Sequence, residues 1–250
     1  MRWLAALRFL TIMPLPGRQA SPEEVGGSTA YFPLVGIIIG LILAGLNWFF
    51  SLLLPSAVVN GLLIVSMVVI NGALHLDGFI DTCDGMAGHK TAAARWRVMR
   101  DSRVGAYGIA GAFCLLLVKY LALNSVPPSL LLATLVLLPV VSRWAMVYTV
   151  FGYPYARPSG LGKAFKQGTG WLQFAMATIM AAAVAWVLFR LAGLVMLAGI
   201  WVIAVVWAAY FKRKFSGLTG DSYGAINELA EVGFLLFVSL LAYKGWLGLA

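Results

Sequence analysis

A histidine and three aspartates in the second quarter of the chain are the clearest candidates for chemistry. Asp77, Asp81 and Asp84 follow one another at intervals of four and three residues. On a helix this spacing puts all three carboxylates on one stripe, where they repel one another unless a cation neutralises them. Oxygen ligands favour a hard ion, so the spacing predicts a site for Mg²⁺, or Mn²⁺, rather than Zn²⁺. His75 precedes them as a ligand or a hydrogen-bonding neighbour, and we count it as a candidate catalytic residue.

The alternative for this segment is a solvated acidic helix face. Such a face would normally mix glutamate with lysine, whereas this one carries aspartates alone between His75 and Gly88. Gly78 and Gly85 interrupt it, although each glycine weakens a helix by about 1 kcal/mol relative to alanine. Glycines are expected where a backbone or a phosphate must approach closely.

A basic segment follows and contains a fourth aspartate. Arg100 and Arg103 lie three residues apart and would share one helix face. Because guanidinium groups fit phosphate oxygens, we expect both to bind substrate. A basic helix that touches anionic lipid is the alternative. We expect Asp101, between the two arginines, to complete the metal ligands.

A glycine-rich segment near the end of the chain supplies further carboxylates. Thr219 and Gly220 lead into a predicted helix, and a helix N-terminus is a natural anion site, so we assign both to substrate binding. Asp221 is a candidate catalytic residue, with a simple N-cap as the alternative. Glu228 and Glu231 lie at the start of the last predicted span, where solvated residues are rare. Glu228 is therefore a second candidate catalytic residue.

Three cations remain to be placed. Arg143 lies about two turns inside a predicted span; it either extends toward the membrane surface or faces the interior and neutralises a phosphate or carboxylate. We assign it to substrate binding. Lys163 lies in a loop of glycines and cations suited to phosphate contact, and we assign it there too. Lys119 is expected near the outer end of its span, with its ammonium group reaching outward.

The composition sets the fold that must position these residues. Of the 250 residues, 62% are hydrophobic and 11% are charged, and the mean hydropathy is +0.91. A soluble domain cannot bury so much apolar surface, and disordered or disulfide-rich chains are excluded as well. The sequence predicts an all-α, polytopic helical integral membrane protein with about seven transmembrane helices. The expected spans are 30–54, 56–74, 105–123, 129–151, 171–189, 192–211 and 228–249, with tight hairpins at Pro55 and Arg190.

The distribution of charge predicts the orientation. With the N-terminus in the cytoplasm and the C-terminus outside, only Arg190 and Lys244 among the basic residues fall in outer segments, as the positive-inside rule requires. The net charge of +9 therefore reflects orientation, and nucleic acid is not an expected partner. All nine acidic residues lie on the inner side, so we expect a cytoplasmic active site at the inner membrane, with membrane lipid as a neighbour.

The chain is predicted to form one membrane-embedded domain, 1–250. Within it we expect an interfacial segment, 1–29, a cytoplasmic Asp/Arg catalytic loop, 75–104, and a glycine-rich loop with an acidic helix start, 212–231. Carboxylates with a magnesium ion, next to arginines, favour phosphoryl-group transfer. One carboxylate outside the metal ligands would take the proton of the attacking hydroxyl.

These motifs resemble those of the cobalamin synthase family, the adenosylcobinamide-GDP ribazoletransferases. The resemblance rests on 75–85 (HLDGFIDTCDG), on 99–105 (MRDSRVG) and on 218–225 (LTGDSYGA), with Glu228 and Glu231. It implies a Mg²⁺-dependent enzyme of the cytoplasmic membrane. Such an enzyme joins adenosylcobinamide-GDP to α-ribazole or α-ribazole 5′-phosphate, giving adenosylcobalamin or its 5′-phosphate and GMP. A homo-oligomer is compatible with this reading.

Two other functions stay open at this point. A transporter of corrinoid or divalent metal would also have apolar spans with a few charges inside them, although its ionisable residues are expected near the midplane. A CDP-alcohol phosphotransferase of lipid synthesis is suggested by Asp81-x-x-Asp84-Gly85, which is similar to the opening of that family's signature. Gly88 and His89 stand where the signature has Ala and Arg.

Overall fold

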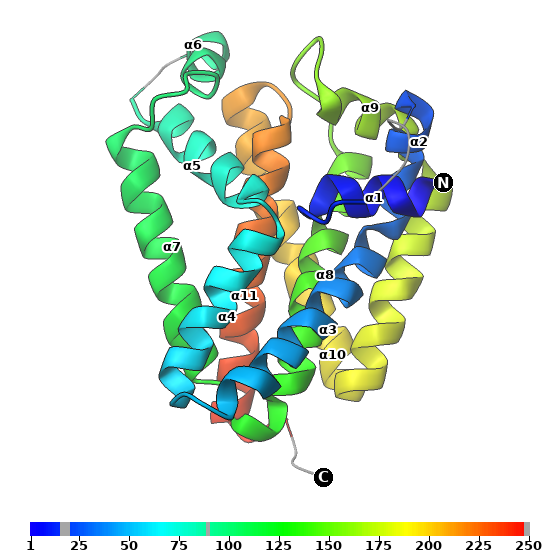
Figure 1. Cartoon of the computed structure of the whole chain (residues 1–250). Coiled ribbons are helices and arrows are strands. Elements are labelled where there is room, and N and C mark those ends of the chain that lie inside the picture. Colours follow the sequence, from blue (N-terminus) through cyan, green and yellow to red (C-terminus); the bar gives the residue numbers. More distant parts are fainter. Residues whose placement is uncertain (16–20, 89–90, 248–250) are drawn as a thin grey trace.

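The computed structural model describes residues 1–15, 21–88 and 91–247, and these fold as a bundle of helices (Figure 1). The elements are α1 (Arg2–Leu10), α2 (Pro22–Gly27), the 3-10 helix η1 (Ser28–Tyr31), α3 (Phe32–Ser51), α4 (Ser56–Ile70), α5 (Leu74–Met86), α6 (Ala92–Val98), α7 (Ala106–Asn124), α8 (Pro128–Gly152), α9 (Leu161–Gly168), α10 (Trp171–Phe215) and α11 (Gly220–Tyr243). The predicted all-α, polytopic membrane fold is confirmed.

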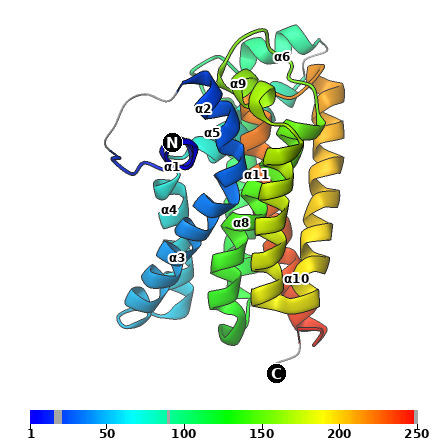
Figure 2. The same ribbon diagram turned by 90° about the vertical axis from the view of Figure 1, so that its right-hand side faces the viewer.

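Long apolar helices form the body of the molecule. By length and composition, the described residues contain five segments able to cross a membrane, or six if the bent pair of α4 and α5 counts as one. The 45-residue α10 counts once among the five, yet its backbone leaves the helical conformation at Arg190 (φ 53°, ψ −135°). Its two halves run side by side in opposite directions (Figures 1 and 2). The hairpin predicted at Arg190 is therefore present.

The structure changes two of the predicted boundaries. The segment 75–104 is not a loop, because α5 and α6 occupy most of it. Gly72 and Ala73 both have positive φ, and this turn bends the chain by 88° from α4 into α5. The last helix starts at Gly220 rather than at 228 because the Thr219 hydroxyl accepts the Ser222 N–H and caps it.

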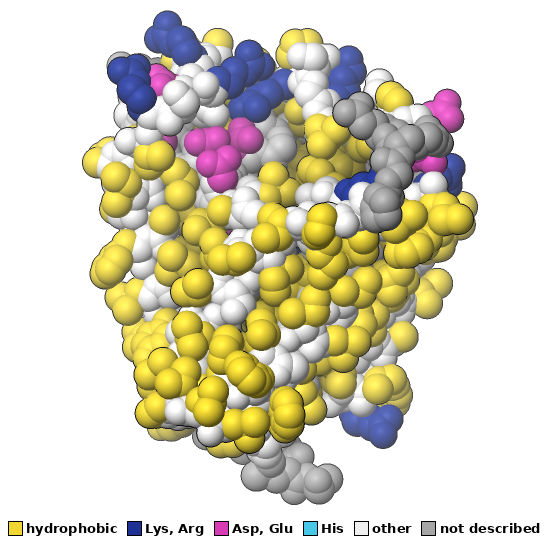
Figure 3. All heavy atoms as spheres, in the orientation of Figure 1, with side chains coloured by type: hydrophobic (Ala, Val, Ile, Leu, Met, Phe, Trp, Pro, Cys, Tyr) yellow, Lys and Arg dark blue, Asp and Glu magenta, His cyan; other side chains and the backbone are white. Residues whose placement is uncertain are grey.

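α8 lies at the centre of the bundle, and α3, α10 and α11 pack against it. Glycines allow the closest of these contacts: a Cβ on Gly40 would lie 2.7 Å from the Val136 backbone of α8. On the face drawn in Figure 3 the outward side chains are mostly apolar, and most of the lysines and arginines gather at the end that holds α6 and α9. The short helix α1 lies across the bundle near that end (Figure 1). This end of the molecule carries the site.

Candidate active site

A cavity of about 420 Å³ opens at the basic end of the bundle. Residues of α1, α3, α5, α8, α9 and α11 line it, together with Arg100 and the 155–160 segment. Its polar lining consists of His75, Asp77, Arg100, Arg157, Ser159 and Asp221, and its aromatic lining of Phe9, Phe32, Tyr155, Phe165 and Tyr223. The cavity therefore joins a charged wall to an apolar one.

The crossing of α5 and α11 brings the carboxylates together. A Cβ on Gly78 would lie 2.8 Å from the Asp221 carbonyl oxygen, and one on Gly224 would lie 3.1 Å from the His75 carbonyl oxygen. The two helices can thus touch backbone to backbone only because both positions are glycine. As a result Asp77 of α5 and Asp221 of α11 face the same cavity.

The charged wall contains an ion pair and a repulsive set of carboxylates. Arg157 Nη2 lies 2.7 Å from Asp221 Oδ2. Asp81 lies one turn beyond Asp77 on α5, which lies across the end of the bundle (Figure 1). Burial, and then the charges of Asp77 and Asp221, raise the pKa of Asp81 to about 7, although Arg157 opposes them. Space-filling Figure 3 shows acidic side chains exposed over α5, below the basic rim.

The other two predicted metal ligands have partners elsewhere. Asp84 accepts the N–H groups of Gly105 (2.7 Å) and Gly108 (2.8 Å) and so caps the start of α7. Asp101 binds Arg103 Nη2 at 2.8 Å, and hydrogen bonds from Arg103 lower its pKa to about 2. Among the residues that the structure describes, no three His, Cys, Asp or Glu side chains are arranged to hold a metal ion. The predicted set of four aspartates is therefore not brought together.

The remaining carboxylates still suit a magnesium ion. Mg²⁺ is usually bound by one or two carboxylates, with waters and substrate phosphates as the other ligands. Asp77 lines the cavity, and the charge repulsion at Asp81 is what a cation would relieve. Asp77 and Asp81 on α5 therefore fit the ion, provided that a phosphate substrate supplies further oxygen ligands.

His75 is a buried residue of the cavity lining. Its side chain is 1% exposed, and neither ring nitrogen has a hydrogen-bond partner within the described part of the chain. Burial disfavours a charged imidazole, so we treat His75 as neutral. It also borders a small second pocket that includes Lys119 and Glu228, and it therefore separates the cavity from the bundle interior.

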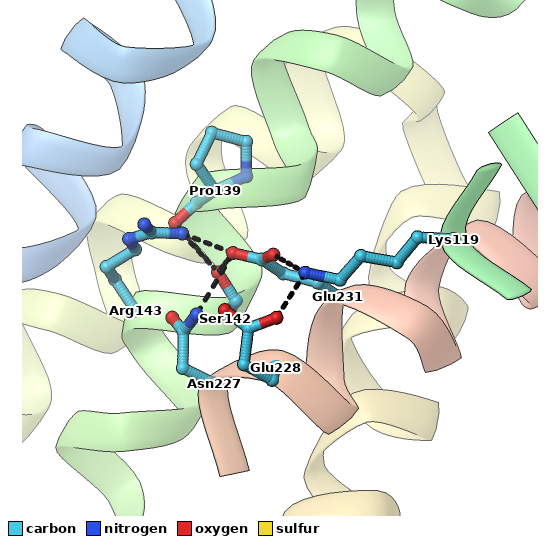
Figure 4. A network of polar contacts seen from close by, with 7 residues as sticks. All are labelled: Lys119, Pro139, Ser142, Arg143, Asn227, Glu228 and Glu231. Atoms are coloured by element: carbon cyan, nitrogen blue, oxygen red, sulfur yellow. Dashed lines mark hydrogen bonds and ion pairs between the residues drawn. The ribbon is translucent and has the colours of Figure 1, made fainter. Parts of the chain in front are cut away.

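The interior holds a buried ion network (Figure 4). Lys119 of α7 donates to both Glu228 and Glu231 of α11. Arg143 Nη1 of α8 lies 2.6 Å from Glu231 Oε1. Ser142 and Asn227 donate to the same oxygen. Two cations thus neutralise two carboxylates inside the bundle, as buried charges require.

This network corrects the prediction for Lys119. Its side chain does not extend outward, because it is 1% exposed and paired with both glutamates. Arg143 does face the interior, but its ionic partner is Glu231 rather than a group of the cavity. Glu228 also lies outside the cavity lining. The sequence did contain a signal for this pairing. Two acids and two cations lie within predicted spans, where charged side chains usually pair with one another.

The remaining predicted binding residues are divided between the cavity and its surroundings. Arg100 and Gly220 line the cavity, whereas the Arg103 side chain turns to Asp101. Lys163 Nζ binds the Pro158 carbonyl oxygen at 2.8 Å, and Thr219 serves as the cap of α11. Sequence reasoning missed Arg157, although it lies at the start of the loop that suggested phosphate contact.

Comparison with known proteins gives a consistent result over almost the whole chain. The family model described as cobalamin-5-phosphate synthase matches residues 2–239. A protein of Geotalea daltonii is 38% identical over 97% of this chain and 98% of its own length. Proteins of Desulforamulus reducens (35% identical, 96% of each chain) and Roseiflexus sp. (38%, 95% of this chain and 88% of its own) are also similar. All three are named adenosylcobinamide-GDP ribazoletransferase. No solved structure matches the chain.

Proposed function

Because the chain belongs to the cobalamin-5-phosphate synthase family and is a transferase of cobalamin biosynthesis, we propose that it joins adenosylcobinamide-GDP to α-ribazole or α-ribazole 5′-phosphate and releases GMP. The observation that carries this proposal is the cavity between α5 and α11, where carboxylates and arginines meet an aromatic wall. A pyrophosphate substrate needs cationic groups for its oxygens, and a nucleoside acceptor needs a surface for its base.

In the proposed reaction, a ribose hydroxyl of the acceptor attacks the phosphorus next to cobinamide. A new phosphorus–oxygen bond forms, and the bond to the bridging oxygen of the pyrophosphate breaks, so that GMP leaves. Arg157 and Arg100 line the cavity, and their guanidinium groups suit the phosphate oxygens. Asp221, fixed by Arg157 at 2.7 Å, is our candidate to take the proton of the attacking hydroxyl.

Asp77 and Asp81 are the residues that would hold a magnesium ion. The ion would neutralise pyrophosphate oxygens and the charge on the leaving phosphate. Glu228 and Arg143 have no direct part in this proposal. In the bundle interior Glu228 binds Lys119, and Arg143 binds Glu231. Their role is to hold α7, α8 and α11 together behind the site.

We place the cavity on the cytoplasmic side of the inner membrane. The lysines and arginines that gather around it (Figure 3) support this orientation through the positive-inside rule. A water-soluble nucleotide product and a membrane-embedded protein body are compatible with such a location.

GMP release in detergent or liposomes tests the proposal. The purified protein should form GMP from adenosylcobinamide-GDP and α-ribazole in the presence of Mg²⁺. Chelation by EDTA should abolish the reaction, and excess Mg²⁺ or Mn²⁺ should restore it. GMP release that EDTA does not affect would contradict the proposed role of the metal ion. Substrate uptake into proteoliposomes without chemical conversion would favour a carrier. Headgroup transfer from a CDP-alcohol would instead identify a lipid-synthesis enzyme.

A further inference from the structure

The segment that carries Arg100 runs from Met99 to Gly105, between the end of α6 and the start of α7. Residues 100–104 are all exposed, and yet Arg100 lines the cavity, where the proposed function assigns it to phosphate oxygens. An exposed segment of this kind makes few packing contacts along its length. The place of Arg100 therefore depends on what holds the two ends of the segment.

The first end rests on α5 at Gly85. Met99 is 3% exposed, and a Cβ on Gly85 would lie 2.5 Å from Met99 Cγ. Only glycine leaves room for the methionine side chain at this point. The start of the segment is thus packed directly against the α5 backbone.

The second end is bound by Asp84, the residue before Gly85. Asp84 Oδ2 accepts the Gly105 N–H at 2.7 Å, and Oδ1 accepts the Gly108 N–H at 2.8 Å. A Cβ on Gly105 or on Gly108 would lie 2.5 Å from one of these oxygens, so the carboxylate reaches both N–H groups only because both positions are glycine. We call Asp84, Gly105 and Gly108 the Asp84 clamp.

A local ion pair shapes the segment between its ends. Asp101 Oδ1 accepts the Arg103 backbone N–H at 3.1 Å and the Arg103 Nε–H at 3.0 Å, and Asp101 Oδ2 lies 2.8 Å from Arg103 Nη2. Both residues are exposed, and exposed pairs contribute little to stability. This pair closes a turn within the segment but does not tie the segment to the bundle.

We infer that Asp84 is a positioning residue, which holds the 99–105 segment on α5 and so keeps Arg100 at the cavity, and that it is not a ligand of the metal ion. The inference rests on the proposed function for the role of Arg100. Asp84 continues the helical spacing of Asp77 and Asp81, but it is 8% exposed and both of its oxygens already accept N–H groups. Among the described residues that line the cavity, Asp77 is one and Asp84 is not.

A double-mutant cycle tests whether Asp84 acts through Arg100. Asparagine has the size of aspartate, but its amide group would turn an N–H toward one of the two glycine N–H groups. In Asp84→Asn and in Arg100→Met, the KM for adenosylcobinamide-GDP should rise about ten-fold, the size expected for losing a charged hydrogen bond, while the KM for α-ribazole changes less than two-fold. The double variant should stay within two-fold of Arg100→Met, because both substitutions remove the same contact. A double variant with about the product of the two single effects would overturn the inference.

Ser21→Ala is the matched control for the loss of a helix cap. The Ser21 hydroxyl accepts the Glu24 N–H at 3.2 Å and caps α2, so its loss should leave the KM for adenosylcobinamide-GDP within two-fold of wild type. A rise as large as in Asp84→Asn would show that the loss of any cap has this effect, and would contradict the specific role of Asp84.

Gly105→Ala disturbs the clamp while every aspartate stays in place. Its methyl group would push the Asp84 carboxylate away, and the KM for adenosylcobinamide-GDP should again rise about ten-fold. Gly61→Ala is its control, because a Cβ there would lie 3.7 Å from its nearest neighbour, Tyr120 Cε2. An unchanged KM in Gly105→Ala would contradict the clamp.

Thermal unfolding in EDTA, without substrates, separates a clamp from a metal ligand. Asp84→Asn should lower the unfolding temperature in detergent by about 4 °C or more, since hydrogen bonds to a charged group are lost. Asp77→Asn should not lower it, because this change removes one charge from the repulsive set around Asp81. If Asp84 were only a metal ligand, its substitution would cause no such fall in the absence of metal, and that result would overturn the inference.

The binding of labelled inorganic pyrophosphate, measured by equilibrium dialysis, separates this inference from the proposed function because it needs no turnover. Asp84→Asn, Arg100→Met and their double variant should bind the probe equally weakly, and Ser21→Ala should bind it like wild type. If the wild type forms no GMP but this order holds together with the fall in unfolding temperature, the proposed reaction fails and the clamp stands. If GMP forms and Asp84→Asn binds pyrophosphate like wild type, the clamp fails alone.

Discussion

Asp77 is the residue on which the proposed chemistry depends most directly. Its carboxylate lines the cavity and adds to burial in raising the pKa of Asp81 one turn away. Asp77→Asn keeps the size of the side chain but removes the charge, so we expect kcat to fall by about 100-fold or more. The measurement is GMP release at saturating substrates. Glu23→Gln is the matched control, because Glu23 is an exposed acid of α2 that does not line the cavity, and its rate should stay within two-fold of wild type. A loss of less than ten-fold in Asp77→Asn would count against the assigned role.

Single residues also show how much of the site the spacing of the sequence can predict. The stripe of Asp77 and Asp81 was predictable because four residues make about one helical turn. Asp84 extends the same spacing, but the structure shows that its two oxygens are occupied by the N–H groups of Gly105 and Gly108. That contact depends on where α7 begins relative to α5, which no local pattern encodes.

At the level of the elements, the contact between α5 and α11 positions the site. Gly78 allows this contact, since a Cβ there would lie 2.8 Å from the Asp221 carbonyl oxygen. Gly78→Ala should separate the helices, move Asp77 away from Asp221 and lower kcat/KM by about ten-fold or more. Gly45→Ala in α3 is the control, because a Cβ there meets nothing within 4 Å; it should preserve activity and gain up to about 1 kcal/mol of helix stability. Equal rates for both variants would show that the close contact is not needed.

The ion network joins α7, α8 and α11, and its loss should lower the stability of the folded protein. Lys119 on α7 neutralises Glu228 and Glu231 on α11. In Lys119→Met both carboxylates stay buried, with Arg143 as their remaining cation, and the cost of breaking such a buried pair is about 3–5 kcal/mol. We expect a clear fall of the thermal unfolding temperature in detergent. Adding Glu228→Gln should recover part of it, since one uncompensated charge is then removed.

The control for this network is the exposed cation at the end of α11. Lys244→Met should leave the unfolding temperature almost unchanged, because Lys244 is exposed and surface charges contribute little. A similar fall in Lys119→Met and Lys244→Met would mean that the network does not stabilise the bundle.

At the level of the whole molecule, composition was enough to predict the fold class but not to predict which charged residues pair in the interior. An 11% share of charged residues excludes a soluble domain, and the break at Arg190 was visible as a basic residue between two apolar stretches. Lys119 was misplaced because its partners lie 109 and 112 residues away, so the pairing exists only after α7 packs on α11. The apolar part of the cavity lining has the same origin, since Phe9, Phe32 and Phe165 come from α1, α3 and α9.

The orientation of the molecule gives the last prediction. The cavity and α9 lie at one end of the bundle, and α7 ends at Asn124 at the other (Figure 1). If the basic end is cytoplasmic, a cysteine at exposed Gln167 of α9 should react with an impermeant maleimide only after the membrane is permeabilised. A cysteine at exposed Ser125, just after α7, should react in intact spheroplasts. Both are made in a background with Cys83 and Cys114, the free cysteines of the described residues, replaced by serine, and GMP release confirms that each variant is folded. The reverse pattern of labelling would place the cavity outside the cell, away from its proposed nucleotide substrate.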